Sequence, residues 1–296
     1  MNHALICPVC SEPLAIDESS LAKYKSVSCA QGHLFDYAKQ GYLNLLLSQH
    51  KKSKHPGDTL EMVQARTQFL NQGFYDSISD FLIQECLTKN SLSNSIALPA
   101  NSPFHYCDLA CGEGFYTQRI HNHIQKSIAN ELASTGIDIS TPAIKSACQR
   151  TKEIQWLISS LARIPLADNS QNLVTGLFFH FDLEEIKRIL KPEGSFIMVT
   201  TGPEHLIELR TLIYDKVKEE RFKDFSHMRH GLSHTKTLHL KEVKKLTSSK
   251  HILSLFAMTP HYWRCTLEKK QRLETLSELS LTIDIQFDMF IKNDSL

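Results

Sequence analysis

Residues 106–117 join an apolar strand to a helix through a glycine-rich turn, and this stretch constrains the fold more than any other. Tyr-Cys-Asp-Leu-Ala-Cys-Gly-Glu-Gly-Phe-Tyr-Thr reads as a short buried strand, a turn with Gly112 and Gly114, and a helix start. Neither glycine has a side chain to keep a ligand away from the backbone. The first turn of the helix offers free N–H groups to an electron-rich ligand. We therefore expect a small-molecule site at this turn.

The turn does not match two common nucleotide-binding motifs. Ala110 stands where the G-x-G-x-x-G pattern has its first glycine, and the spacing after Gly114 differs. No Gly-Lys-Ser/Thr follows, so a nucleoside triphosphate is not expected. A turn of this kind can also be purely structural. A second strand, however, ends near Asp138, whose carboxylate could accept both ribose hydroxyls of a nucleoside cofactor.

Strand and helix patterns alternate after this turn, which predicts a parallel, doubly wound α/β sheet. Near the C-terminus, apolar residues alternate with mostly polar ones over 281–291, which predicts a final strand with one wetter face. Helical patterns are expected at 117–125, 141–152 and 183–190. The preceding strand patterns cover 105–109, 134–138, 154–158, 173–178 and 195–200.

The N-terminus carries two pairs of metal-ligand residues in the pattern C-x2-C…C-x3-H. These are Cys7, Cys10, Cys29 and His33. Four N/S ligands suit a tetrahedral zinc ion and leave no open position, so the zinc would be structural. The alternative is a coincidence of buried thiols, but a segment this short has little core of its own. The other cysteines are expected to be reduced and buried: Cys86, Cys107, Cys111, Cys148 and Cys265.

The chain of 296 residues is long enough for a small and a large domain. We expect a zinc-binding domain at 1–48 and an α/β domain at 49–296, whose first part, 49–104, holds a basic hinge, helices and a loop. A formal net charge of +1 does not by itself indicate a nucleic-acid partner. A positively charged surface that binds nucleic acid would therefore have to be local. The chain shows no secretion signal and no membrane-spanning run, so a cytoplasmic protein without a membrane partner is expected.

The hinge is a basic run at 49–55 followed by the turn Pro56-Gly57. Its lysines, Lys51, Lys52 and Lys54, could contact phosphates, although such a run is also what a solvated linker looks like. Helical patterns are expected at 58–69 and 78–87, and a loop at 89–104.

Taken in order, these motifs resemble the bacterial 23S rRNA guanine-N1-methyltransferases, the family that includes a tylosin-resistance enzyme. The Asp-Leu-Ala-Cys-Gly-Glu-Gly turn with the acidic end of the next strand is similar to the cofactor motif of class I S-adenosylmethionine-dependent methyltransferases. The resemblance covers nearly the whole chain. It further rests on the zinc motif and on Lys39-Gln-Gly-Tyr-Leu-Asn-Leu-Leu46, His50-Lys-Lys-Ser-Lys54, Pro56-Gly-Asp58, Met62-Val-Gln-Ala-Arg66, Gly202-Pro-Glu-His-Leu-Ile-Glu-Leu209 and Met258-Thr-Pro260.

The resemblance implies a class I (Rossmann-like) sheet with an antiparallel C-terminal strand behind a zinc-binding, RNA-docking domain. It also implies S-adenosylmethionine as methyl donor: Gly112, Glu113 and Gly114 would wrap its methionine portion, and Asp138 would hold its ribose. Ser160 and Leu161 would border the adenine, while Tyr75 and His205 close over the cofactor. The full set of cofactor residues is Tyr75, Asp108, Gly112, Glu113, Gly114, Asp138, Ser160, Leu161 and His205.

The implied reaction is methylation of N1 of a guanine in a 23S rRNA hairpin loop. That atom lies on the Watson–Crick edge, so the base must be unpaired and must lose its proton. His180 and Asp182 are candidates for that step by position only. The segment 177–181 departs from the family pattern. The expected RNA contacts are Lys51, Lys52, Lys54, Arg66, Arg229 and a His-rich loop at 227–239.

Two other functions are compatible with the sequence. The departure at 177–181 could mark an RNA-binding protein that binds the cofactor without methylating. A small-molecule methyltransferase is the other alternative, although such an enzyme needs no zinc-bearing RNA-docking arm. A homodimer is also compatible with the sequence.

Overall fold

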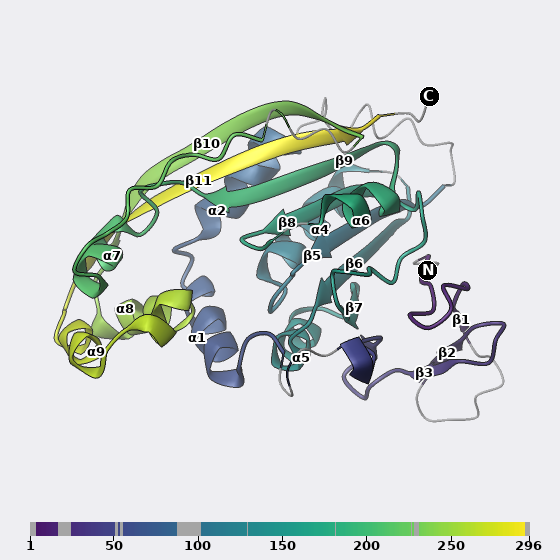
Figure 1. The fold of residues 1–296 in the computed structure, drawn as a ribbon, viewed down its shortest axis with the longest axis horizontal. Helices are drawn as coiled ribbons and strands as arrows, with labels where there is room; N and C mark the ends of the chain where they lie inside the picture. The colour runs from purple at the N-terminus through teal and green to yellow at the C-terminus, as the bar shows by residue number, and fades with distance from the viewer. Residues whose placement is uncertain are drawn as a thin grey trace.

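The computed structural model describes residues 4–16, 25–50, 53, 56–87, 102–128, 130–180, 182–225, 227 and 231–293. Within these ranges the protein has a small three-stranded antiparallel sheet and an eight-stranded mixed sheet with helices packed on it (Figure 1). In this described part, no helix is long and apolar enough to cross a membrane.

The eight-stranded sheet has the order β10-β11-β9-β8-β5-β6-β7-β4. Its strands from β4 to β9 run parallel, and β11 runs antiparallel to both β9 and β10. The strand order turns back at β5, and ligands of open α/β sheets bind outside the strand ends at such a point. The strands are β4 (Leu43–Asn44), β5 (Phe104–Leu109), β6 (Leu132–Asp138), β7 (Gln155–Ile158), β8 (Gln171–Leu177), β9 (Leu190–Thr201), β10 (Leu232–Leu246) and β11 (Leu279–Lys292).

The predicted doubly wound sheet with an antiparallel C-terminal strand is confirmed, with two corrections. Most of the region expected as a His-rich loop belongs to β10, which pairs with β11 along nearly its whole length. The polar face of β11 is buried rather than wet, because segment 202–225 covers it: Asp284 accepts the Glu204 N–H, and Gln286 donates to the Lys223 carbonyl.

Several helices begin at a residue whose side chain accepts an N–H group of the first turn. Thr59 caps α1, which begins at Leu60 rather than at the expected residue 58, and Ser140 caps α5. The helix expected at 78–87 is α2 followed by a π-helical turn, Leu82–Cys86. The helices are α1 (Leu60–Leu70), α2 (Asp76–Phe81), α4 (Phe115–Ser127), α5 (Thr141–Arg150), α6 (Leu183–Ile189), α7 (Ile207–Ile213), α8 (Ser249–Ala257) and α9 (Leu267–Glu274).

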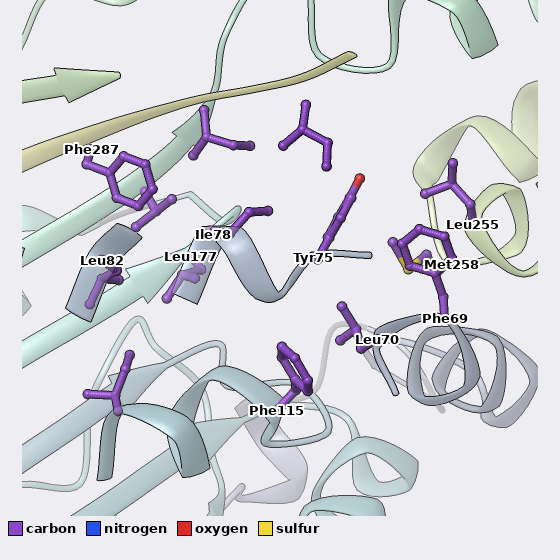
Figure 2. Packing of buried hydrophobic residues seen from close by; sticks show 14 of the residues in the cluster. Phe69, Leu70, Tyr75, Ile78, Leu82, Phe115, Leu177, Leu255, Met258 and Phe287 are labelled. Carbon is purple, nitrogen blue, oxygen red and sulfur yellow. The ribbon is translucent and has the colours of Figure 1, made fainter. Parts of the chain in front are cut away.

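Alternate side chains of the central strands pack into two large apolar clusters, one on each face of the sheet. On β5, Tyr106 faces the cluster that holds α2, α4, α7 and α8, whereas Cys107 faces the cluster that holds α6 and the N-terminal residues. Figure 2 shows part of the first cluster, in which Tyr75 lies between Phe69 and Met258 on one side and Ile78 on the other. This packing holds the segment before β5 against the carboxyl ends of the strands.

The N-terminal region is joined to the large sheet by backbone pairing. Its small sheet contains β1 (Ala15–Ile16), β2 (Ser26–Ser28) and β3 (Leu34–Asp36) and lies beside the β7 edge (Figure 1). Leu5 forms an antiparallel bridge with Leu166, and β4 pairs in parallel with β7. Part of the predicted 1–48 domain is thus an edge strand of the large sheet, and a boundary at 48 stays a prediction.

Candidate functional site

Four side chains predicted to bind zinc come together at the start of the chain. The ligand atoms of Cys7, Cys10, Cys29 and His33 all lie within 4.8 Å of one another. The Cys10 and Cys29 sulfurs are 3.6 Å apart, and Nδ1 of His33 is 3.3 Å from the Cys29 sulfur. Donors bonded to one tetrahedral zinc at about 2.3 Å have separations of this order. The donor set therefore fits a closed, structural zinc site.

The glycine-rich turn follows β5 with three residues in the left-handed region: Ala110 (φ 55°), Gly112 (φ 56°) and Gly114 (φ 84°). A side chain at Gly112 would meet only the Arg66 guanidinium, at 3.6 Å, so this glycine does leave the backbone open. A Cβ at Gly114 would lie 2.8 Å from the Trp156 ring. Gly114 is therefore required for packing of the helix start, and its contact with the cofactor stays a prediction.

A cavity of about 300 Å³ opens at this turn, at the carboxyl ends of β5, β6 and β8. Four predicted cofactor residues lie in its wall, whereas Gly114, Ser160 and Leu161 do not line it. Leu161 packs instead toward the cluster beneath α6, and the Ser160 hydroxyl accepts the Ala162 N–H. The predicted residues in the wall are Asp108, Gly112, Glu113 and Asp138.

Asp138 lies at the end of β6 and lines the first cavity. Its two oxygens accept the backbone N–H groups of Gly112, at 2.9 Å, and Ser140, at 2.7 Å. Burial raises the pKa of Asp138, and these two hydrogen bonds act in the opposite direction. An ionised carboxylate has about four acceptor positions, so two remain for the hydroxyls of a ribose.

Asp108 lines the first cavity with a carboxylate that is already hydrogen-bonded within the protein. Both of its oxygens accept hydroxyl groups of the protein, from Thr117 and Thr175. Burial raises the pKa of Asp108 to about 6, against the lowering effect of these two hydrogen bonds. Its main task is to tie β5 to α4 and β8.

Two buried polar atoms in the cavity region lack a hydrogen-bond partner among the described residues. One is Oε1 of Glu113, whose other oxygen is paired with Arg150, and the other is the Tyr116 hydroxyl. Buried polar groups are normally paired, so each needs a donor or acceptor from elsewhere. The α4 N-terminus also has no side-chain cap. These groups fit the ammonium and carboxylate of an amino-acid moiety, as in the methionine portion of S-adenosylmethionine.

A second cavity, of about 540 Å³, adjoins the first. The two share Asp58, Arg66, Phe178 and Phe179 in their walls. Tyr75 and His205, predicted to close over the cofactor, line this second cavity rather than the first. The two cavities therefore offer adjoining places for two ligands.

His205 is held as a neutral ring in the wall of the second cavity. Burial lowers its pKa to about 3, and the neighbouring Arg210 and His261 act in the same direction. Its Nδ1 accepts the Asp284 N–H at 3.3 Å, so the proton of the neutral ring is on Nε2. Nε2 lies 3.3 Å from the Tyr75 hydroxyl and donates to it. His205 is thus oriented from both sides.

The two residues considered for proton removal differ in position. His180 is exposed and lines the second cavity. Asp182 is the N-cap of α6 and accepts the N–H groups of Glu184 and Glu185. This capping role is sufficient to account for an aspartate at this position. Asp182 lines neither cavity, and we drop it as a catalytic candidate.

Arg66, predicted to contact RNA, lies between the cavities, paired with Asp58 and donating to the Met258 carbonyl. Its RNA contact stays a prediction. Of the other predicted RNA contacts, Lys51, Lys52, Lys54 and Arg229 lie outside the described residues. Other residues of the cavity walls are not among the predicted site residues, for example Asp58, Tyr116, Phe178 and Met258. Asp58 and Met258 belong to motifs that carry the family resemblance, and Phe178 lies in the segment 177–181 that departs from the family pattern.

Comparisons with known proteins agree with both halves of this site. Residues 5–54 match the family model described as "RlmA, N-terminal", a zinc ribbon, and residues 107–198 match a methyltransferase domain. The zinc site and the cofactor cavity are the features that these two models imply. The zinc ribbon and the class I methyltransferase fold are therefore both present in one chain.

Curated relatives match most of the chain. A putative 23S rRNA (guanine-N(1)-)-methyltransferase of Micromonospora griseorubida is 30% identical over 88% of this chain and 86% of its own length. A protein of the same description from Bacillus subtilis (strain 168) is 26% identical over 94% of each chain. The 23S rRNA (guanine(748)-N(1))-methyltransferase of Streptomyces fradiae is 29% identical over 69% of this chain and 66% of its own. The chain therefore belongs to the family of 23S rRNA (guanine-N1)-methyltransferases.

Proposed function

We propose that the protein transfers the methyl group of S-adenosylmethionine to N1 of a guanine in a hairpin loop of 23S rRNA. Family membership supports the substrate class, and the methyltransferase domain supports the methyl donor. The observation that carries the proposal is the pair of adjoining cavities at the strand ends. One has the groups that fit the cofactor, and the other has room for a base beside it.

In the first cavity, the chain's own residues would hold the cofactor at its two ends. Asp138 would accept the ribose hydroxyls with its remaining lone pairs. Glu113, Tyr116 and the uncapped start of α4 would pair with the amino-acid end. When bound, S-adenosylmethionine supplies an electrophilic methyl group on a sulfonium. The protein then contributes mainly by positioning, since a neutral leaving group needs no acid.

The proton on guanine N1 must leave as the new bond forms. His180 lines the second cavity and is exposed, so a neutral imidazole there could take up this proton directly or through water. His205 is a poorer base, because its pKa is lowered to about 3 and its Nδ1 already accepts a backbone N–H. We assign His205 a positioning role in the wall of the cavity.

The zinc ribbon would dock the RNA at a fixed place relative to the cavities. Backbone hydrogen bonds join Ile6 to Pro165 and Leu45 to Ile158, so the ribbon and the sheet share a continuous framework. RNA hairpins are recognised by shape and phosphate contacts, with splayed bases stacked on aromatic rings. The lysines and the arginine predicted to contact RNA, Lys51, Lys52, Lys54 and Arg229, would supply positive charge for phosphate contacts.

The proposal is tested by incubating the protein with unmethylated 23S rRNA and S-adenosylmethionine carrying a labelled methyl group. Methylation of N1 blocks the Watson–Crick edge, so reverse transcription should stop next to one guanine of a hairpin loop. Label on another atom would contradict the N1 assignment while keeping the methyltransferase. Cofactor binding without any labelled RNA would favour an RNA-binding protein that does not methylate.

A further inference from the structure

Arg188, in α6, has a hydrogen-bond partner for every N–H group of its guanidinium. Its Nε and Nη2 donate to the two carboxylate oxygens of Glu185, at 2.8 and 2.9 Å. The other bonds go to the carbonyls of Leu166 and Ile164, at 2.8 and 2.7 Å, and to the Asp168 carboxylate, at 2.7 Å. A guanidinium carries its five N–H groups in a fixed planar fork. The side chain therefore holds the loop between β7 and β8 against α6 in one geometry.

Backbone groups of the same loop also bond the start of the chain. The Ile6 N–H donates to the Pro165 carbonyl at 3.1 Å, and the Ala167 N–H donates to the Ala4 carbonyl at 2.9 Å. These bonds come from the residues that alternate with those bonded to the arginine, because successive backbone groups of an extended chain point to opposite sides. The loop therefore lies between α6 and the first residues of the zinc ribbon, and it is bonded to both.

The residues bonded by this loop lead directly into the zinc site. Cys7, one of the four residues of the zinc cluster, follows Ile6 in the chain. Arg163 at the start of the loop adds a side-chain bond, since it donates to the Ser11 hydroxyl at 2.7 Å. A third cavity, of about 580 Å³, lies between the two parts, with Ser11 in its wall on the ribbon side and Arg188 on the other. The place of the metal site relative to the sheet thus depends on the loop that Arg188 holds.

The ribbon has a second attachment, at β7. The Leu45 N–H donates to the Ile158 carbonyl at 2.9 Å, and the Tyr37 hydroxyl donates to the Gln155 side chain at 2.8 Å. A body held at one place can still turn about that place, whereas a second attachment fixes its orientation. The loop bonded by Arg188 therefore sets how the ribbon is turned relative to the cavities at the strand ends.

We infer that Arg188 is a positioning residue that determines, through the orientation of the zinc ribbon, which nucleotide of the RNA is methylated. The inference rests on the proposed function, in which the ribbon docks the RNA and the large sheet binds the cofactor. An RNA held by the ribbon reaches the methyl group at a nucleotide that the orientation of the ribbon selects. Methyl transfer depends steeply on such placement, because a displacement of about 1 Å caused far from the chemistry can lower a rate by about 100-fold.

The test uses a stem-loop RNA of the methylated region, with a second unpaired guanine placed one nucleotide from the target. Reverse transcription reports methylation of each guanine separately. Arg188→Lys keeps the positive charge beside Glu185 and Asp168, but an ammonium group has only three N–H groups and no planar fork. It should lower kcat/KM at the target guanine by about 10- to 100-fold, and the ratio of target to neighbouring methylation by at least about threefold.

The methylation ratio separates positioning from a simple loss of folded protein. Unfolded molecules methylate neither guanine, so lower stability reduces both products equally and leaves their ratio unchanged. Calorimetry should give a dissociation constant for S-adenosylmethionine within about threefold of the wild type, because Arg188 and the cofactor cavity share no partner. Metal analysis should show an unchanged zinc content.

Hydrogen exchange measures the attachment itself. In Arg188→Lys the amides of Ile6 and Ala167 should exchange at least about tenfold faster than in the wild type, while the Leu45 amide at the second attachment should not change. Asp168→Ala is the matched variant, because it removes an exposed partner of the same guanidinium and leaves both loop carbonyls bonded. It should keep the wild-type methylation ratio and exchange rates.

The combined results distinguish the inference from the proposed function. Faster exchange at Ile6 and Ala167 with a wild-type methylation ratio would overturn the inference, because the choice of nucleotide would not depend on this attachment. An altered ratio without faster exchange would overturn it too, as would an Asp168→Ala protein that is altered as much as Arg188→Lys. In all these cases the proposed function stands. A wild-type protein that binds the cofactor and methylates no RNA would overturn the proposed function and the inference with it.

Discussion

The zinc ribbon and the large sheet are held together by different means. The ribbon strands contain only two or three residues, and its apolar residues Ile16 and Leu34 are each 56% exposed. In the large sheet, Phe104, Tyr106 and Phe196 are fully buried. The ribbon therefore depends on its four metal ligands, whereas the sheet depends on apolar burial.

This difference explains why the buried acids lie in the sheet. Asp108 and Glu113 are each 1% exposed, and Asp138 accepts two backbone N–H groups at the strand ends. Burying a carboxylate costs free energy unless it is well paired. The apolar burial of the large sheet can offset the free-energy cost of buried carboxylates at its functional edge. The ribbon, with its small apolar core, cannot offset such a cost.

The largest expected effect is on the ribbon. Cys29→Ala removes one of four zinc ligands, and structural zinc in small domains contributes about 10–16 kcal/mol of folding free energy. We expect metal analysis to show zinc lost from the variant and limited proteolysis to cut within residues 5–36. The large sheet should stay protected, because most of its apolar core comes from residues outside the ribbon.

Cys265→Ser is the matched control, because this thiol lies outside the zinc cluster. It should retain one zinc ion per chain and resist cleavage in the ribbon. If Cys29→Ala unfolded the sheet as readily as the ribbon, the two regions would not differ as described. A wild-type protein with well under half an equivalent of zinc and a folded ribbon would refute the four-ligand site.

The next effect concerns the site that the sheet supports. Asp138→Ala removes the carboxylate expected to hold the ribose, and two charge-assisted hydrogen bonds are worth roughly 2–4 kcal/mol. Calorimetry should show S-adenosylmethionine binding weakened by roughly 30- to 700-fold, with zinc content unchanged. Asp168→Ala, at an exposed carboxylate outside both cavities, should bind like the wild type. Equal affinities for Asp138→Ala and the wild type would remove Asp138 from the site.

The sequence predicts the sheet well where burial decides the pattern. Its five central strands are short, mostly buried segments that alternate with helical patterns, and this alternation predicts a parallel sheet. It fails at β10, which is read as a loop because histidines and lysines dominate it. β10 is the edge strand of the sheet, and charged residues, lysine above all, are common on edge strands.

The site is predictable only where the chemistry is local in the chain. The zinc ligands are two close pairs, and the turn with Gly112 precedes its own helix. Phe178 meets His205 only because β8, β9 and β11 are neighbours in the sheet, and no local pattern reports that. The expectation that Ser160 borders the adenine rests on the family resemblance alone, and the loop after β7 places this residue outside the cavity wall.

A pH-dependent effect tests the cost of a buried acid in the sheet. The folded-state pKa of Asp108 is raised to about 6 from an ordinary value of 3.8. Its contribution to stability is therefore full below pH 3.8 and is lost as the pH rises through about 6. Asp108→Asn cannot ionise, so its free energy of unfolding should exceed that of the wild type by up to about 3 kcal/mol above pH 6 and by little near pH 4.

Denaturant unfolding of both proteins between pH 4 and pH 7 measures this difference directly. Asp168→Asn is the comparison for the same substitution at an exposed position, since 69% of that side chain is exposed. Parallel curves for Asp108→Asn and the wild type would show that the acid is not costly in the folded state. Thr117 and Thr175 can pair with an amide as well as with a carboxylate, so packing should be preserved.

The smallest expected effect is at the turn itself. Ala110 adopts φ 55°, a left-handed backbone conformation that costs a residue with a Cβ about 1–2 kcal/mol. Glycine adopts this conformation without that cost. Glycine also increases the conformational entropy of the unfolded chain, which lowers the stability of the folded protein by about 0.4–1 kcal/mol. Ala110→Gly should therefore stabilise the sheet by about 0.5–1 kcal/mol and raise Tm by about 1–4 °C. Ala143→Gly, inside α5, should instead destabilise the protein, because glycine is about 1 kcal/mol less favourable than alanine in a helix. A destabilised Ala110→Gly would mean that its methyl group gains more from packing than the strained turn costs.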